Sequence, residues 1–369
     1  MIGKYLYYTN IDMEKPTGIQ KKILCQLKVF NKKNNRCELY YIESEKKSKF
    51  RFFLGKIPIL GSKFNKWKFN LDITKLDYLY IRRPSVFDSS FIKFLKKIKQ
   101  SNMRVKIIVE IPTYPYDSEY GSSVVGKFYL AVDKLYRRKL KNVVDRFAVV
   151  AWTGEGNDIW GVPVIPIYNG IDLDIVKKKK CYAHKEVNLL CIAYFSPWHG
   201  YEKFIEALYR YYEEKTDVDI MIHMVGIGPE LSKYQEMVDK YNLQDYIIFY
   251  GELNEGIDEI YEKVDIGVCS IGSNLFGVKL NSQLKSREYL AKGLPIISAG
   301  DIDILQGIEF PFEYKVDPSQ PIDLKSIIHV YQNTYAIDPQ VNTDKIRVFA
   351  EKTCSWSSTM STLLEYLGI

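Results

Sequence analysis

Residues 282–295 read SQLKSREYLAKGLP, and the apolar triplet IIS follows directly. The apolar residues of this stretch recur near helical spacing, which predicts a helix. Gly293 marks the end of the expected helix, and Pro295 opens a short apolar strand. A helix, a glycine and a strand in this order form half of a βαβ unit, so the stretch indicates a parallel sheet covered by helices.

The expected helix carries Lys285, Arg287 and Glu288 in its first two turns. A helix N-terminus presents free backbone N–H groups, and two cations beside it suit an anion. A glutamate at this place suits ribose hydroxyls, as in other doubly wound nucleotide sites. Spacing alone leaves a second interpretation open, a surface helix whose charges lie on its solvated face.

The string KSREYLAKGLPIIS resembles the donor-site motif of glycosyltransferase family 4 (group 1), retaining enzymes that use nucleotide-sugars. The resemblance implies an α/β protein with two Rossmann-like doubly wound domains facing across a cleft, the GT-B fold. It implies that Glu288 holds the nucleotide ribose and that Asn281, Ser282 and Lys285 belong to the donor site. Leu280 stands where the family often has another glutamate at the sugar, so the transferred sugar stays open.

The length of 369 residues predicts two domains of comparable size. Residues 1–180 carry 36 basic and 17 acidic side chains, a balance of +19, whereas the remainder carries 16 and 28, a balance of −12. We expect an acceptor domain at 1–172, joined by a C-terminal helix at about 356–369. A linker at 173–186 and a nucleotide-sugar domain at 187–355 complete the expected organisation.

The cysteines and the apolar segments indicate a cytoplasmic protein. The six cysteines show neither close pairing nor metal spacing, which is typical of reduced thiols. The first residues lack the apolar segment of a signal peptide, and no apolar run approaches the ~18 residues of a membrane span.

A proline-rich loop in the first half, EIPTYPYDSE at 110–119, follows an expected strand at 104–110. Prolines and aromatic side chains after a strand predict a rigid loop suited to a sugar or an acceptor. Many family members have a histidine at about this place, but all four histidines of this chain lie beyond residue 180. The candidates for its role are the polar residues of the loop: Glu110, Thr113, Tyr114 and Tyr116.

The family's phosphate contacts correspond to residues 193–203 of the second half. Ala193-Tyr194 and His199-Gly200 replace the family's Gly-Arg and Lys-Gly pairs. The resemblance therefore implies that His199, Lys203, Lys285 and a helix N-terminus bind the diphosphate, although a lone histidine before a helix is otherwise a structural cap. Two glycine turns correspond to family turns at the donor or acceptor: Gly18, after the turn-rich residues 14–17, and Gly226-Ile-Gly228.

The resemblance implies a retaining transfer of a hexose-type sugar from a nucleoside diphosphate donor, with UDP as the expected nucleotide. The acceptor is a glycan in capsule, O-antigen or other surface polysaccharide synthesis. We expect no cofactor and no metal, because the three Asp-x-Asp pairs fall away from the expected phosphate site and no cluster has metal-ligand spacing. The alternatives are a GT-B epimerase, a non-catalytic sugar-nucleotide binder or a basic nucleic-acid-binding protein, although the basic half lacks a known nucleic-acid motif.

Two basic amphipathic helices are expected at 89–99 and 127–143. Together with the local balance of +19, they indicate peripheral binding to the anionic inner face of the plasma membrane. Family members often act there on polyprenyl-diphosphate-linked glycans, which makes such a lipid-linked glycan the expected acceptor. The alternative for each helix is a core-facing apolar stripe with solvated lysines behind it.

Overall fold

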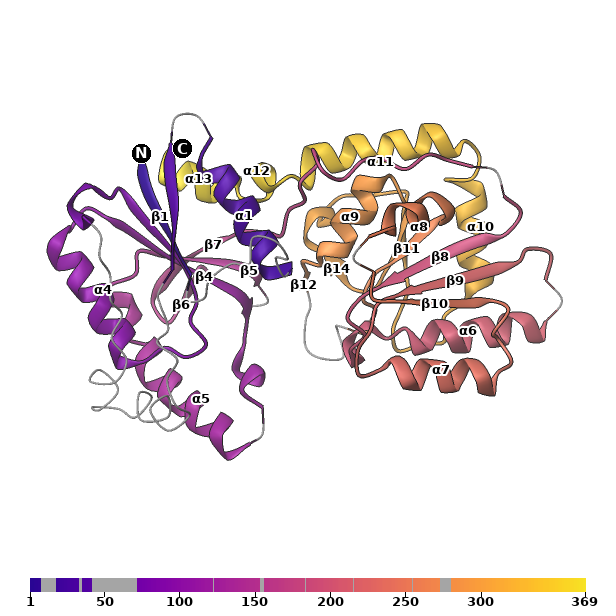
Figure 1. Cartoon of the computed structure of the whole chain (residues 1–369), viewed down its shortest axis with the longest axis horizontal. Coiled ribbons are helices and arrows are strands. Elements are labelled where there is room, and N and C mark those ends of the chain that lie inside the picture. Colours follow the sequence, from indigo (N-terminus) through magenta and orange to yellow (C-terminus); the bar gives the residue numbers. More distant parts are fainter. Residues whose placement is uncertain are drawn as a thin grey trace. The chain divides into compact units, whose positions relative to one another are not determined.

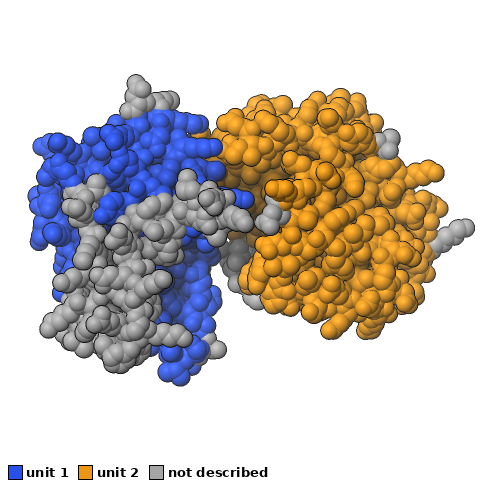
Figure 2. Space-filling model, viewed as in Figure 1, with its two compact units in different colours: residues 1–168, 360–369 blue, residues 169–359 orange. Residues whose placement is uncertain are grey.

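The computed structural model of the chain divides into two compact units (Figure 2). Unit 1 comprises Met1–Tyr168 and Met360–Ile369, and unit 2 comprises Asn169–Thr359. The structure describes residues 1–7, 18–32, 35–41, 72–121, 123–152, 156–182, 184–214, 216–253, 255–272 and 280–369. The turn-rich residues 14–17 expected before Gly18 lie outside these ranges.

Unit 1 contains a doubly wound sheet in the order β2-β1-β3-β4-β5-β7-β6. Neighbouring strands are parallel except β6, which is antiparallel to β7. The order reverses between β1 and β3, which makes this point the topological switch of the sheet. The strands are β1 (Ile2–Tyr7), β2 (Arg36–Tyr41), β3 (Tyr78–Arg82), β4 (Lys106–Tyr114), β5 (Arg146–Trp152), β6 (Asp158–Ile159) and β7 (Val162–Pro166).

The helices of unit 1 follow from apolar faces and caps. In α4, Phe91, Leu95 and Ile98 are buried on one face, and the Asp88 carboxylate caps the helix by accepting from the Phe91 N–H (3.0 Å). The C-terminal helix joins this unit through Lys106, whose Nζ donates to the Tyr366 carbonyl (2.7 Å). The helices are α1 (Gly18–Phe30), α4 (Ser89–Ser101), α5 (Val124–Arg137) and α13 (Ser361–Leu367), labelled in Figure 1.

Two expectations for unit 1 need correction. The strand expected to end at Glu110 continues to Tyr114, because Thr113 and Tyr114 pair with Ala151 and Trp152 of β5. The helix expected at 127–143 is α5, which ends at Arg137, and a short 3₁₀ turn at Leu140–Asn142 follows. The predicted helix at 89–99 is present as α4.

Unit 2 contains a parallel six-stranded sheet in the order β10-β9-β8-β11-β13-β15, the Rossmann order with its switch between β8 and β11. The apolar strand predicted after Pro295 is β13, and it pairs with both β11 and β15. A separate two-stranded sheet joins β12 and β14. The strands are β8 (Val187–Ile192), β9 (Ile220–Val225), β10 (Ile247–Gly251), β11 (Ile266–Val268), β12 (Leu280–Asn281), β13 (Ile296–Ser298), β14 (Asp301–Ile302) and β15 (Glu313–Lys315).

Helices cover both faces of the unit 2 sheet, with α6 and α7 on one face and α8 and α9 on the other (Figure 1). The segment expected as a linker contacts this unit, because the Lys179 N–H donates to the Lys292 carbonyl (2.9 Å). Arg347 likewise donates to the carbonyl groups of Leu173 and Val176. The helices are α6 (Glu202–Glu213), α7 (Leu231–Lys240), α8 (Ile257–Lys263), α9 (Leu284–Lys292), α10 (Leu324–Asn333), α11 (Pro339–Thr353) and α12 (Trp356–Thr359).

Candidate functional site

The candidate site lies at the switch between β8 and β11 of unit 2, where ligands bind in open α/β sheets. The loop after β8 contacts the loop after β11, since the Ile271 N–H donates to the His199 carbonyl (3.0 Å). Gln283, which precedes α9, holds the helix N-terminus beside β11. Its side chain accepts from the Ser270 N–H (2.8 Å) and donates to the Ser270 carbonyl (3.2 Å).

Tyr201 sits at the centre of the site with a fully buried ring. Its hydroxyl lies 3.2 Å from the Val268 carbonyl of β11 and 3.4 Å from the Ile192 carbonyl of β8. The same hydroxyl accepts a hydrogen bond from Nζ of Lys285 (2.8 Å). Tyr201 therefore fixes the Lys285 ammonium at the ends of the two strands that define the switch.

The Lys285 ammonium lies in a largely apolar environment. Its Nζ also lies over the Tyr201 ring, 5.1 Å from the centroid. Burial lowers the pKa of Lys285 to about 8, against the opposing effect of the nearby Cys269 and Cys191 thiols. The side chain is therefore mainly charged at neutral pH, and a bound anion would stabilise that charge.

His199 is not the cation that the sequence suggested. Burial, together with the Lys285 ammonium, lowers the pKa of His199 to about 3. Nδ1 of the ring lies 3.0 Å from the Ser196 backbone nitrogen and 3.2 Å from the Ser196 carbonyl oxygen, so this loop holds the ring in place. The ring stacks on Tyr201 with 5.5 Å between centroids, which places it beside Lys285.

Glu288 and Lys203 flank this centre. Glu288 lies one turn after Lys285 on α9, on the same helix face, and its side chain is half-buried. Burial, together with the Glu288 carboxylate, raises the pKa of Tyr261. Lys203 lies in the first turn of α6 and is half-buried.

The two glycines after β9 allow the neighbouring loops to approach closely. A Cβ atom on Gly226 would lie 1.8 Å from the Ala193 carbonyl oxygen, and one on Gly228 would lie 2.4 Å from the Phe195 carbonyl oxygen. Both glycines also have φ in the range that other residues rarely adopt, +136° and +148°. They therefore shape the loop after β8 that leads to His199.

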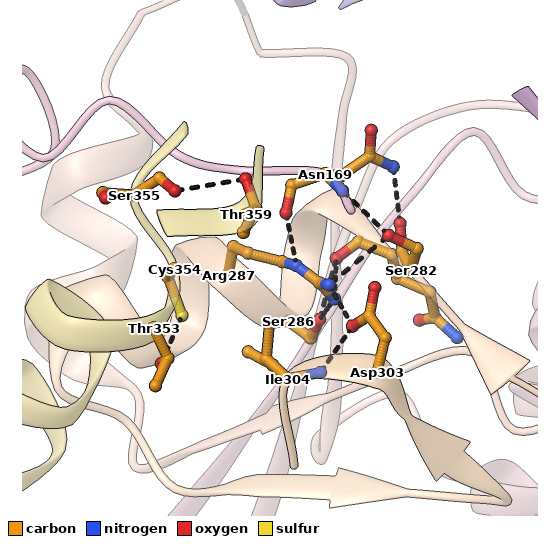
Figure 3. Close-up of polar contacts among 11 residues, drawn as sticks. Asn169, Ser282, Ser286, Arg287, Asp303, Ile304, Thr353, Cys354, Ser355 and Thr359 are labelled. Atoms are coloured by element: carbon orange, nitrogen blue, oxygen red, sulfur yellow. Dashed lines mark hydrogen bonds and ion pairs between the residues drawn. The ribbon is translucent and has the colours of Figure 1, made fainter. Parts of the chain in front are cut away.

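The Arg287 side chain is buried and makes contacts within unit 2 (Figure 3), although it lies only two residues from Lys285 in the sequence. The side chain is fully buried and forms an ion pair with Asp303. Its Nε donates to the Asn169 carbonyl (2.9 Å), and one Nη donates to the Ser286 hydroxyl (2.9 Å). The sequence suggested Lys285 and Arg287 as anion-binding cations. Arg287 instead stabilises the segment before α9, because it donates to the Gln283 carbonyl and the Ser282 hydroxyl.

Asn281 and Ser282, two further residues predicted at the donor, also make internal contacts. The buried Asn281 amide donates to the Ala299 carbonyl (3.3 Å). The Ser282 hydroxyl accepts from the Asn169 N–H (3.0 Å), as Figure 3 shows. Both residues position the start of α9.

Unit 1 contains a different assembly, around the middle of β4 and the last residue of β3, which we call the Glu110 cluster. Glu110 is fully buried and forms ion pairs with Lys22 (3.1 Å) and Arg82. Burial alone would raise the pKa of Glu110, but these two cations lower it to about 2. The other members are hydrogen-bonded neutral side chains: Tyr5, Gln26 and Tyr80.

The remaining predicted residues of unit 1 separate into buried and partly exposed ones. Glu110 has no exposed surface, and Tyr116 is 1% exposed with its hydroxyl donating to Asp133 (2.8 Å), so neither reaches a substrate in this structure. Thr113 and Tyr114, at the end of β4, are half-buried, and Tyr114 stacks on Trp152. Gly18 is the exposed first residue of α1.

Sequence reasoning missed Tyr201 and the role of Gln283. The only signal for Tyr201 was its place directly after His199-Gly200, before the expected helix. Within the described ranges, no group of three or more His, Cys, Asp or Glu side chains is arranged to hold a metal ion. None of the helices in the described part of the chain is long and apolar enough to cross a membrane.

The arrangement suits a diphosphate. A lysine ammonium, an imidazole ring and the N-terminus of a nine-residue helix lie at the carboxyl ends of β8 and β11, and Glu288 follows one turn after Lys285. The family model described as "Glycosyl transferases group 1" matches residues 174–321, which include every one of these groups. Over residues 174–321 the chain is therefore similar to group 1 glycosyl transferases.

The chain is also similar to a known protein and to several solved structures. Protein CapJ of Staphylococcus aureus is 25% identical over 259 residues, and the match covers 62% of this chain and 62% of CapJ, so less than two thirds of that relative is spanned. Two solved structures cover residues 174–321 and the rest of the chain. Anabaena Alr3699/HepE in complex with UDP has a TM-score of 0.60 at 14% identity, with 100% of both chains covered.

Sucrose-phosphate synthase from Thermosynechococcus elongatus has a TM-score of 0.63 at 12% identity, with 100% of this chain and 99% of that chain covered. Identities this low establish the fold alone. These neighbours are GT-B proteins with two Rossmann-like domains, and the predicted fold class is confirmed. The region that the group 1 model matches contains the switch between β8 and β11 with Lys285 and His199.

Proposed function

We propose that the protein transfers a hexose-type sugar, with retention of configuration, from a nucleoside diphosphate donor to a glycan acceptor. The observation that carries this proposal is the overlap between the region at 174–321 that the group 1 model matches and the Lys285–His199–Tyr201 site. UDP is the proposed nucleotide, and HepE was solved with UDP and with UDP-glucose. The chain is proposed to belong to glycosyltransferase family 4 within group 1.

The site's groups have distinct proposed roles. The Lys285 ammonium, the His199 imidazole and the α9 N-terminus bind the diphosphate, while Glu288 accepts hydrogen bonds from ribose. During transfer the bond between the anomeric carbon and the phosphate oxygen breaks, and a bond to an acceptor oxygen forms. The acceptor proton leaves with the diphosphate or to water. The developing charge on the diphosphate is stabilised by donors already in place, without a metal ion.

The proposed acceptor is a lipid-linked glycan of capsule or another surface polysaccharide, at the inner face of the plasma membrane. The similarity to CapJ supports the capsule pathway as a starting point. Lys93, Lys96 and Lys97 of α4 are exposed, as are Val124 and Val125 at the start of α5 (85% and 51%). Exposed lysines attract anionic lipid, and exposed apolar side chains can enter the headgroup region.

The decisive experiment incubates the protein with a panel of UDP-sugars, with and without glycan acceptors, and measures UDP release and the anomeric configuration of the product by NMR. A retained configuration that requires acceptor supports the proposal, whereas conversion of donor alone indicates an epimerase. Activity should persist in EDTA. Glu288→Ala should lower kcat/KM at least about 100-fold. Glu259→Ala, an exposed glutamate of α8, is the matched control. Near wild-type activity of Glu288→Ala would refute the site.

A further inference from the structure

A separate pocket lies within unit 1, at the carboxyl ends of β3 and β4. Its volume is about 610 Å³, which is within the usual range for small-molecule sites. Among the described residues, its lining includes two arginines, two tyrosines, one proline and one acid: Arg82, Arg83, Pro112, Glu119, Tyr120 and Tyr129. We call it the Arg83 pocket.

Arg83 is the group that points to a ligand. Its side chain is only 9% exposed, and the guanidinium lies 3.8 Å from the centroid of the Tyr116 ring. Nη2 donates to the Glu119 carboxylate (2.7 Å), whereas Nη1 is buried and has no hydrogen-bond partner among the described residues. Buried charged donors are rarely left unsatisfied, so an unpartnered Nη1 on a side chain that lines a pocket indicates an absent acceptor group.

The charge of the pocket favours an anion. Arg82 also lines the pocket, although its guanidinium is paired with Glu110, and the first turn of α5 contributes Gly126 near the positive end of a 14-residue helix. Glu119 is the one acid among the described lining residues, and its side chain is 49% exposed and already paired with Arg83. A planar guanidinium with a free edge suits a carboxylate or a phosphate.

Resting on the function proposed above, we propose that the Arg83 pocket binds an anionic group of the acceptor glycan, a carboxylate or a phosphate on a sugar, through Nη1 of Arg83. Tyr120 and Tyr129 then contact the sugar ring, since aromatic side chains are the usual apolar lining of such sites. The donor groups all lie in unit 2, in the region that the group 1 model matches, whereas the Arg83 pocket belongs entirely to unit 1. The substrate class is therefore an acidic acceptor.

The test measures binding of three probes to the full chain by saturation-transfer NMR and calorimetry: glucuronic acid, glucose 1-phosphate and neutral glucose. The anionic probes should bind at least about tenfold more tightly than glucose. Preference for glucuronic acid assigns a uronic-acid unit, and preference for glucose 1-phosphate assigns a phosphorylated one. Equal binding of all three probes would overturn the proposal.

Two variants are expected to change the binding of the anionic probe in opposite directions. Arg83→Gln should weaken the anionic probe about tenfold or more, because Nη1 is lost. Glu119→Gln should strengthen it, because a competing carboxylate disappears and Arg83 is released. Arg104→Gln, an exposed arginine of the same unit, should change neither. A loss in Arg83→Gln without a gain in Glu119→Gln would contradict a site at the guanidinium.

UDP binding separates this proposal from the function it rests on. All three variants should keep the wild-type affinity for UDP, because the residues proposed to bind UDP lie in unit 2. If UDP fails to bind the wild-type protein, the proposed function fails whatever the anionic probes do. If UDP binds normally and the probes show no preference for charge, only the acidic acceptor is refuted.

Discussion

Both units place charged side chains on or beside parallel strands, but they use them in different ways. In unit 1, Glu110 is buried between Lys22 and Arg82, and Gln26 and Tyr80 donate hydrogen bonds to it. In unit 2, Lys285 has a tyrosine hydroxyl as its partner and no carboxylate within ion-pair distance among the described residues. Position on the sheet therefore does not reveal function, whereas the internal pairing of the charge does.

Lys285 and Arg287 show the same contrast within one helix. Both are cations in the first turns of α9. Arg287 is fully buried, and Asp303, Asn169 and Ser286 accept its hydrogen bonds. Because the cation of Lys285 is not neutralised by such a pair, it is the one available for a phosphate.

The largest expected effect is on the Glu110 cluster. Glu110→Gln should lower the free energy of unfolding by about 3–5 kcal/mol, because Lys22 and Arg82 become buried cations without a counter-charge. Urea denaturation followed by fluorescence measures the change. Asp158→Asn, at an exposed aspartate of the same unit, should stay within about 0.5 kcal/mol. A loss below about 1 kcal/mol for Glu110→Gln would show that the cluster does not hold unit 1 together.

The cluster also has a predicted pH dependence. The pKa of Glu110 in the folded protein, about 2, is below its ordinary value of 4.5. The folded state therefore gains stability from Glu110 above pH 4.5 and loses it as the pH falls towards 2. In Glu110→Gln this part of the acid unfolding should be absent.

The next effect concerns the outer face of unit 1. Replacing Lys93, Lys96 and Lys97 by Gln should weaken binding to vesicles with anionic lipid by about 1 kcal/mol per residue, measured by co-sedimentation. Lys99 is left unchanged, because its ammonium pairs with Asp145 (2.7 Å). Turnover on a soluble acceptor should not change.

The control replaces three exposed lysines of unit 2: Lys240, Lys345 and Lys352. If both triple variants lose the same affinity, net charge and not the α4 face explains the binding. Equal binding of the wild-type protein to neutral and anionic vesicles would remove the membrane surface from the proposed function.

A smaller effect is expected at Lys285. Lys285→Gln should weaken UDP binding by about 1.5–3 kcal/mol, the range for a charge-assisted hydrogen bond, while the protein remains folded. Calorimetry measures the affinity, and thermal unfolding serves as the folding control. Unchanged affinity for UDP would mean that the diphosphate lies elsewhere.

The smallest effect is the pH dependence of the same site. Burial lowers the pKa of Lys285 to about 8 from an ordinary value of 10.5, so UDP affinity should fall about tenfold per pH unit above pH 8. The free protein should behave in the opposite way, with stability rising between pH 8 and 10.5, since the unfolded chain binds the proton that the folded site releases. Neither trend should occur in Lys285→Gln.

Local patterns predicted part of the fold. The helix after residue 282, the strand after Pro295 and the helix at 89–99 are present, because each has a clear apolar pattern. β15, with three residues, is too short for such a signal. The continuation of β4 past Pro112 depends on pairing with β5, which is 38 residues away in register, and no local pattern contains that partner.

The site was predictable only in part. The motif around Lys285 and Glu288 located α9, but burial could not be read from it, so Arg287 looked equivalent to Lys285. His199 and Lys285 are 86 positions apart, and the strand order that brings β8 beside β11 makes them neighbours. The partners of Glu110 are separated in the same way, since Lys22 and Arg82 come from α1 and β3. Charges that neutralise one another across a fold leave no signature in a single stretch of sequence.

The central claim is that the switch between β8 and β11 holds a nucleoside diphosphate. A crystal structure of the full chain with UDP tests it most directly. We predict that the diphosphate lies within hydrogen-bond distance of Nζ of Lys285 and Nε2 of His199, with the ribose at Glu288. A diphosphate bound away from Lys285, for example in the Arg83 pocket, would contradict the account.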